Sequence, residues 1–254
     1  MSGKFSISGA VRNAYAFVGK EWRYLLRFSL FPIGLNLLTN VFVFSQQESI
    51  SLPFSIIWNL PACAATAWFV FIEVRLLLLG EKITALPEDP AYLESRKRSM
   101  TLCITMFLLL YMTTMAIMGF QMWSRAQSSD IMDVVSMGAL FLLGVGLWAV
   151  RFAPAPILAA VDQPIKPYLE KVHGAGISFR LLGMYMLAIL PIILFFMVLR
   201  SIVMPDVELT KLTLEVVLLD APLAVSIWCV LGAACSYALK EILGTTGGRK
   251  DVRP

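Results

Sequence analysis

The chain alternates between long apolar runs and short polar stretches. A helix that crosses a bilayer needs roughly 20 consecutive, mostly apolar residues. Six runs reach about that length, near residues 22–44, 54–79, 100–123, 137–161, 181–203 and 216–239. The connecting loops are too short for a soluble domain, which would need ~50 residues or more. The pattern therefore predicts an all-α polytopic membrane protein, a bundle of six transmembrane helices, with any activity confined to the bundle or its rims.

A shorter amphipathic stretch precedes the first run. Apolar residues recur there at spacings of three and four, while basic residues lie on other faces: Ile7, Val11, Ala14, Val18 and Trp22. This periodicity predicts an N-terminal amphipathic helix that lies on the cytoplasmic membrane surface. A second interpretation explains the pattern equally well, in which the helix extends the first span and packs on the cytoplasmic loops.

The composition agrees with a membrane protein. Of the 254 residues, 58% are hydrophobic and 15% are charged, and the mean hydropathy is +0.76. A soluble domain of this size is far more polar. A soluble enzyme, a disordered chain and a disulfide-rich secreted module are therefore excluded.

The positions of the basic residues predict the orientation. Cytoplasmic loops retain Lys and Arg. Sixteen of these residues lie on the side that carries both termini, and three lie on the other side. Both termini are therefore expected in the cytoplasm. The predicted organisation is a cytoplasmic amphipathic segment at 1–21, a transmembrane domain at 22–240 and a cytoplasmic tail at 241–254.

Four ionisable residues lie within the apolar runs and form a candidate intramembrane polar site: Glu73, Arg75, Arg151 and Asp220. A charge at mid-membrane costs about 3 kcal/mol even on lenient insertion scales. Because Glu73 and Arg75 are two positions apart, they project from different sides of a helix, and each is expected to need its own partner on another helix. In the alternative interpretation, both charges snorkel to the cytoplasmic rim and pin helices there.

Arg151 is followed by two prolines, Pro154 and Pro156. Pro154 removes a backbone donor and clashes with the carbonyl of Val150, so the helix is expected to kink or break there. A cation beside free carbonyls is typical of substrate sites in transporters, although proline is also a common means of shaping membrane helices. Asp220 is expected to be an interfacial helix cap or, in the alternative, an inward-facing proton or cation site.

Basic residues at the cytoplasmic rim are candidate contacts for lipid headgroups. A basic triplet at the head of the third run follows an acidic, proline-limited turn, and each such charge attracts anionic lipids by roughly 1 kcal/mol. The triplet also serves as a topogenic signal. The predicted headgroup contacts are Arg96, Lys97, Arg98, Arg12 and Lys20. The expected partners are a phospholipid membrane with anionic lipids and another membrane protein or a second copy, and not nucleic acid.

The sequence predicts no cofactor and no metal site. Haem, zinc and di-iron sites need several histidines or carboxylates together, and the chain has one histidine, His173, which is expected at the surface. The cysteines lie in apolar runs without a CxxC pair and are expected to be small buried residues. They are Cys63, Cys103, Cys229 and Cys235.

Two hairpins resemble a known group of proteins. The stretch from Arg75 to Glu81, with the proline-rich loop and basic triplet after it, resembles a group of bacterial inner-membrane proteins of uncharacterised role. The stretch 148–191, with Arg151 and residues 176–180 leading into Leu-Leu-Gly, is similar to the same group. It is more remotely similar to the membrane domain attached to some glycerophosphodiester phosphodiesterases. The resemblance implies a six-helix fold in the bacterial inner membrane. The chain lacks the phosphodiesterase domain and its metal ligands, so that activity is not implied.

These observations favour a non-enzymatic accessory or scaffold protein that binds membrane proteins or lipids. The alternative is a small transporter or channel for an anionic solute or lipid, centred on the break at 151–156 and on Arg75. A third interpretation is an intramembrane enzyme that uses Glu73, Asp220 and His173 as acid–base groups. Because these three residues are predicted on different sides of the membrane, one active site that contains them is disfavoured.

Overall fold

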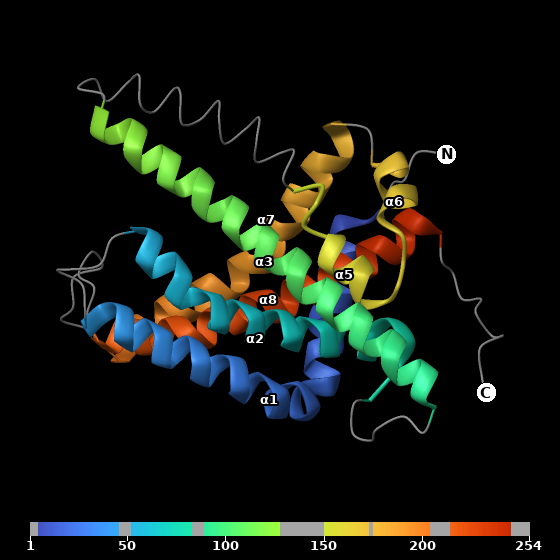
Figure 1. The fold of residues 1–254 in the computed structure, drawn as a ribbon, viewed down its shortest axis with the longest axis horizontal. Coiled ribbons are helices and arrows are strands. Elements are labelled where there is room, and N and C mark those ends of the chain that lie inside the picture. Colours follow the sequence, from blue (N-terminus) through green and yellow to red (C-terminus); the bar gives the residue numbers. More distant parts are fainter. Residues whose placement is uncertain are drawn as a thin grey trace.

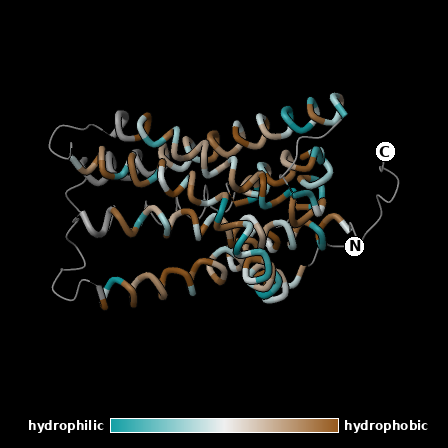
Figure 2. Tube along the Cα trace, turned by 90° about the horizontal axis from the view of Figure 1, so that it is seen from below, coloured by the Kyte–Doolittle hydropathy of each residue, from teal (hydrophilic) through white to brown (hydrophobic). Residues whose placement is uncertain are grey.

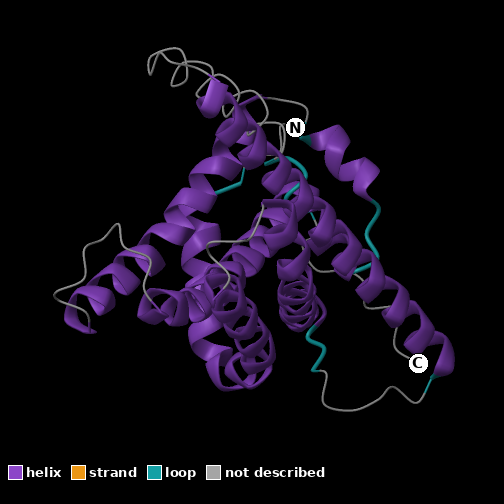
Figure 3. Cartoon of the chain, turned by 60° about the vertical axis from the view of Figure 1, so that its left-hand side comes forward, coloured by secondary structure: helices purple, strands orange, loops and turns teal. Residues whose placement is uncertain are grey.

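The structure, a computed structural model, describes residues 5–45, 52–82, 89–127, 150–172, 175–203 and 214–244. Within these ranges the chain forms helices joined by turns and loops, and no strand (Figure 3). The helices in chain order (Figure 1) are α1 (Ile7–Ser45), α2 (Leu52–Leu79), α3 (Pro90–Gln127), α5 (Ala155–Ala160), α6 (Ile165–Lys171), α7 (Ala175–Val203) and α8 (Leu214–Leu243).

Five helices of the described ranges are long and apolar enough to cross a membrane: α1, α2, α3, α7 and α8. They coincide with five of the six predicted runs, which confirms an all-α membrane protein. The remaining run, 137–161, lies mostly outside the described residues. Hydrophilic positions gather at one end of the bundle, where α1 begins and α8 ends (Figure 2). We call this the polar end.

Helices α2 and α8 form the centre of the bundle. In the most apolar stretch of each helix, buried residues make up 67% in α2 and 50% in α8. The corresponding share is 17% in α1 and α3 and 22% in α7. Gly232 of α8 lies against Val70 and Glu73 of α2, and because it has no side chain the two backbones can approach closely. The outer helices expose large apolar side chains, such as Leu190 and Phe195 of α7. In a membrane these faces contact lipid tails or a neighbouring protein.

Helix α1 contains the predicted amphipathic segment and the first span, and it bends between them. Glu21 has non-helical backbone angles (φ −99°, ψ 15°), at the predicted boundary between 1–21 and 22–240. In the first part, Ala10, Val11 and Ala14 are buried in the protein core, Ile7 and Val18 are half-buried, and Trp22 is 52% exposed. Protein therefore covers most of this face, as the packed extension requires, and a position of the helix on the membrane surface stays a prediction. Periodicity shows that a face must be covered, but it does not say whether lipid or protein covers it.

Three hydrogen bonds hold this first part against α7 and α8. The Ser6 amide donates to Glu241 Oε2 at 2.7 Å, and the Tyr15 hydroxyl donates to the carbonyl of Ala188 at 2.7 Å. Arg180 Nη1 donates to the carbonyl of Phe5 at 3.0 Å. The start of α1 and the end of α8 thus lie together at the polar end.

Helical structure is interrupted before Ala155, as predicted from Pro154. Residues 150–154 form a turn, and α5 begins at Ala155 with Pro154 as its N-cap residue. All six residues of α5 are buried. A second turn follows, in which Asp162 adopts a left-handed conformation (φ 54°), which aspartate tolerates better than most residues. These two turns position the groups described next.

Candidate functional site

Arg75, near the end of α2, has three acceptors on three other segments. Its Nε donates to Glu81 Oε2 at 2.5 Å, Nη1 donates to the carbonyl of Ala160 at 2.9 Å, and Nη2 donates to the Tyr92 hydroxyl at 3.0 Å. The guanidinium also lies over the ring of Phe71, 5.5 Å from its centroid. Ala160 ends α5, where carbonyls lack partners within the helix and a cation is favourable. Arg75 therefore joins α2, α3 and α5 at the polar end.

Glu81 extends this network to the basic triplet. Its second carboxylate oxygen, Oε1, lies 3.5 Å from Arg96 Nη1. Arg96 is thus paired within the protein, whereas Lys97 and Arg98 are exposed. Two of the three basic residues in the triplet, Lys97 and Arg98, are therefore available to contact a lipid headgroup. Arg12 and Lys20 of α1 are also exposed.

Asp162 joins the turn after α5 to α3. Its Oδ1 accepts a hydrogen bond from the Ser99 hydroxyl at 2.6 Å, and its Oδ2 accepts one from the Ser95 hydroxyl at 3.3 Å. Sequence reasoning missed this aspartate and the acceptor Glu81. The available signal was two serines four residues apart, which lie on one face of a helix.

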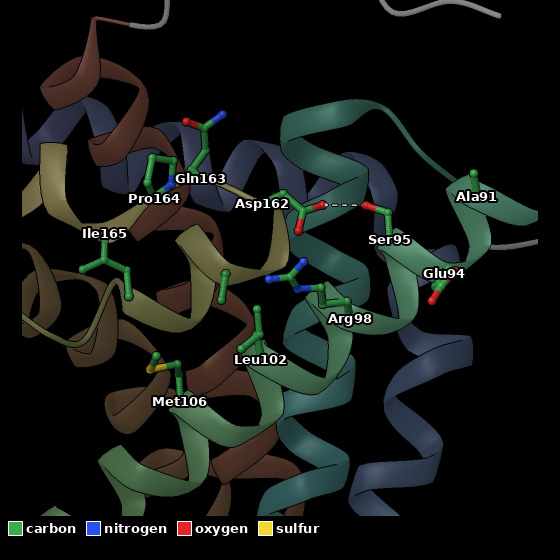
Figure 4. A pocket seen from close by; sticks show the side chains of 11 residues that line it. Ala91, Glu94, Ser95, Arg98, Leu102, Met106, Asp162, Gln163, Pro164 and Ile165 are labelled. Carbon is green, nitrogen blue, oxygen red and sulfur yellow. Dashed lines mark hydrogen bonds between the residues drawn. The ribbon is translucent and has the colours of Figure 1, made fainter.

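A groove of about 710 Å³ separates α3 from the turn between α5 and α6 (Figure 4). Polar residues line it toward the start of α3, and apolar residues line it farther along the helix. Arg98 extends across it toward the turn that carries Asp162. In the part of the chain that the structure describes, the Arg98 guanidinium has neither a hydrogen bond nor an ion pair. The groove thus holds a cation with no partner beside an anion that neutral hydroxyls solvate.

Glu73 faces the opposite way from Arg75. Its side chain is fully buried, and Oε1 accepts a hydrogen bond from the Cys229 thiol of α8 at 3.3 Å. Oε2 has no hydrogen-bond partner among the described residues. A Cβ atom on Gly232 would lie 2.9 Å from this oxygen. The prediction that Glu73 and Arg75 need separate partners on other helices is confirmed, so the two do not form one site.

Arg151 lies in the turn before α5. Its Nε donates to the Ser178 hydroxyl of α7 at 2.6 Å. Nearby Tyr168 of α6 is fully buried, and its hydroxyl has no hydrogen-bond partner among the described residues. Burial and the nearby Cys235 raise the pKa of the Tyr168 phenol, and the charge of Arg151 opposes this. Tyr168 therefore remains a neutral donor at physiological pH.

Asp220 is not a helix cap. It lies within α8, which begins at Leu214, and its Oδ2 accepts a hydrogen bond from Asn40 of α1 at 3.2 Å. The prediction of a cap is wrong because Asp220 lies six residues after the first residue of α8, beyond its first turn. The four candidate residues of the intramembrane polar site have separate partners, and they do not converge.

The described cysteines are free thiols. Cys103, Cys229 and Cys235 are buried, as predicted, and Cys63 is half-buried. Cys235 donates to the Tyr185 hydroxyl at 3.1 Å. His173 lies outside the described residues. Within those residues no three His, Cys, Asp or Glu side chains gather as metal ligands would.

Comparisons with protein-family models, with curated protein sequences and with solved structures gave no match to this chain.

Proposed function

We propose that the protein is a non-enzymatic accessory or scaffold protein of the bacterial inner membrane that binds other membrane proteins and lipids. The observation that carries the proposal is the use of the Arg75 guanidinium. Its three acceptors lie on three different segments, so this buried cation joins helices, and each of its three nitrogen atoms already donates to a group of the protein. Arg151 similarly joins the turn before α5 to α7 through Ser178.

The outer face of α7 supports the proposal. Large apolar side chains recur there at every fourth position and are 52–72% exposed: Met186, Leu190, Leu194, Val198 and Ile202. Residues four apart form one ridge along a helix. Such a ridge fits the groove of another membrane helix or lies against lipid tails.

We further propose six spans with both termini in the cytoplasm. The contact between Ser6 and Glu241 supports an even number of crossings, because it brings the start of α1 and the end of α8 to one end of the bundle. The excess of basic residues on that side supports its assignment to the cytoplasm.

Native mass spectrometry after gentle extraction from the membrane tests the proposal. We expect the chain to retain a defined protein partner or specific lipids. Bulky substitutions on the ridge, Leu190→Trp with Leu194→Trp, should release a partner helix. The matched control is Leu109→Trp, at an exposed apolar position of α3. A chain that emerges alone and without lipid contradicts the proposal.

A transporter of an anionic solute is the second candidate, and one observation favours it. The Tyr168 hydroxyl is buried without a described partner near the Arg151 cation, and two such donors suit an anion. This candidate requires that Arg151→Ala abolish uptake of an anionic solute into vesicles while the protein remains folded. If the variant fails to fold, or transports normally, Arg151 is a structural residue.

A further inference from the structure

The groove between α3 and the α5–α6 turn has the profile of a single phospholipid. Its α3 wall consists of positions 91, 94, 95, 98, 102 and 106, which share one helix face because their spacings are three and four. The span from Ser95 to Met106 is about 16 Å at 1.5 Å per residue. Glu94, Ser95 and Arg98 occupy the end nearer the start of α3. Leu102 and Met106 occupy the end that continues along the span.

The opposite wall repeats this division. Asp162 and Gln163 lie across from the polar end of the groove, while Ala159, Pro164 and Ile165 supply apolar surface. Leu102 is 41% exposed, so its side chain is available to an acyl chain. An amphiphile that lies in the groove can therefore match polar groups with its head and apolar groups with its tail.

The charges in the groove discriminate between headgroups. Arg98 presents a planar guanidinium, which binds phosphate oxygens in a bidentate manner, and it has no partner among the described residues. Asp162 and Glu94 line the same end and repel a headgroup that is only anionic. Asp162 accepts from two neutral hydroxyls, which leave some of the acceptor capacity of its carboxylate free.

We infer that the groove binds a zwitterionic phospholipid with a primary amine, of the phosphatidylethanolamine type. The phosphate binds Arg98, the ammonium group binds Asp162, with Glu94 adding negative charge at the same end of the groove, and an acyl chain lies along Leu102 and Met106. A choline headgroup fits less well because it has no N–H to donate. It is usually held by aromatic rings, and the described lining of the groove contains none. This inference rests on the lipid-binding part of the proposed function and names the lipid.

The test is lipid titration of the purified full-length protein by native mass spectrometry. The probes are phosphatidylethanolamine, phosphatidylcholine and phosphatidylglycerol with identical acyl chains. We expect phosphatidylethanolamine to bind most tightly. Arg98→Gln should weaken its binding about tenfold, the typical effect of one charge-assisted hydrogen bond. Lys166→Gln is the control, because it removes one positive charge from an exposed position outside the lining of the groove, and it should leave binding unchanged.

Two further variants test the amine contact. In Asp162→Asn the new side chain keeps one oxygen acceptor, and asparagine tolerates the positive φ of this position. Glu94→Gln removes a negative charge from α3 and leaves the turn that carries Asp162 unchanged. Each should reduce the preference for phosphatidylethanolamine over phosphatidylcholine while both lipids still bind through Arg98. Circular dichroism confirms that each variant is folded.

Three outcomes overturn the inference. In the first, phosphatidylglycerol or phosphatidylcholine binds as tightly as phosphatidylethanolamine. In the second, Lys166→Gln weakens binding as much as Arg98→Gln does. In the third, the protein binds a partner protein but no lipid, in which case the accessory role stands and only the groove assignment fails. If neither lipid nor partner is retained, the proposed function fails as well.

Discussion

At the scale of single residues, the polar end is organised around Arg75. One guanidinium contacts a carboxylate, a backbone carbonyl and a phenol that belong to different segments. The protein encloses Arg75 almost completely, and the residue is only 3% exposed. Removing it leaves Glu81 without its closest counter-charge and the Ala160 carbonyl without this donor.

Arg75→Met is therefore expected to destabilise the protein by about 3 kcal/mol, the usual effect of breaking a buried ion pair from one side. Thermal unfolding in detergent measures the change. Arg75→Lys should rescue little, because an ammonium group does not reproduce the planar fork that reaches three acceptors. Lys97→Met, at an exposed position of α3, is the control and should unfold like the wild type.

Glu73 and Gly232 form a second residue-scale contact. Because a Cβ at position 232 would lie 2.9 Å from Glu73 Oε2, Gly232→Ala should force the carboxylate or α8 to shift. We expect a loss of about 2 kcal/mol, typical of overpacking a filled core. Glu73→Asp shortens the side chain by one methylene, and the double variant should recover part of the loss. Additive effects in this double-mutant cycle would contradict the contact.

At the scale of elements, the bend in α1 decides where its first part lies. Upstream of Glu21 the helix packs on α7 and α8, and its buried face consists of small residues, including Ala10 and Ala14. Small side chains permit a close approach between helices. The bend thus directs an amphipathic helix onto α7 and α8.

Substitutions at two neighbouring alanines test this arrangement. Ala14 is fully buried and Ala16 is exposed. Ala14→Leu should destabilise the protein by about 2 kcal/mol because the added atoms have no room, while Ala16→Leu should change stability by less than about 0.5 kcal/mol. Equal effects in thermal unfolding would indicate that lipid, and not protein, covers the Ala14 face.

At the scale of the whole molecule, α2 and α8 form a buried pair, and α1, α3 and α7 surround it with apolar outer faces. The described charges and polar contacts concentrate at the polar end, where Glu81, Arg96 and Asp162 join α3 to its neighbours. If the polar end lies in the cytoplasm, reporters fused to either terminus should also lie there.

A fluorescent reporter that matures only in the cytoplasm should give signal when it is fused to either terminus. A phosphatase that is active only outside the cytoplasm should be inactive at both positions. Phosphatase activity at one terminus alone would mean an odd number of crossings, and activity at both would reverse the orientation.

The class of the protein and the positions of five described helices could be predicted from the amino-acid sequence. The sequence also predicted the break at Pro154 and the separation of Glu73 from Arg75. These features depend on local properties. The length of an apolar run, the missing proline donor and the angular spacing of two residues on one helix are all contained in short stretches of chain.

Which groups contact one another could be seen only in the folded structure. The partners of Arg75 at Glu81 and Ala160 lie 6 and 85 positions away, and that of Glu73 lies 156 positions away. Only the fold showed the docking of the first part of α1, the contact of Asp220 with Asn40 and the groove beside Arg98. The physical reason is that these helices are apolar on nearly every face. Periodicity then does not specify which face meets which neighbour, and side-chain packing between helices decides it.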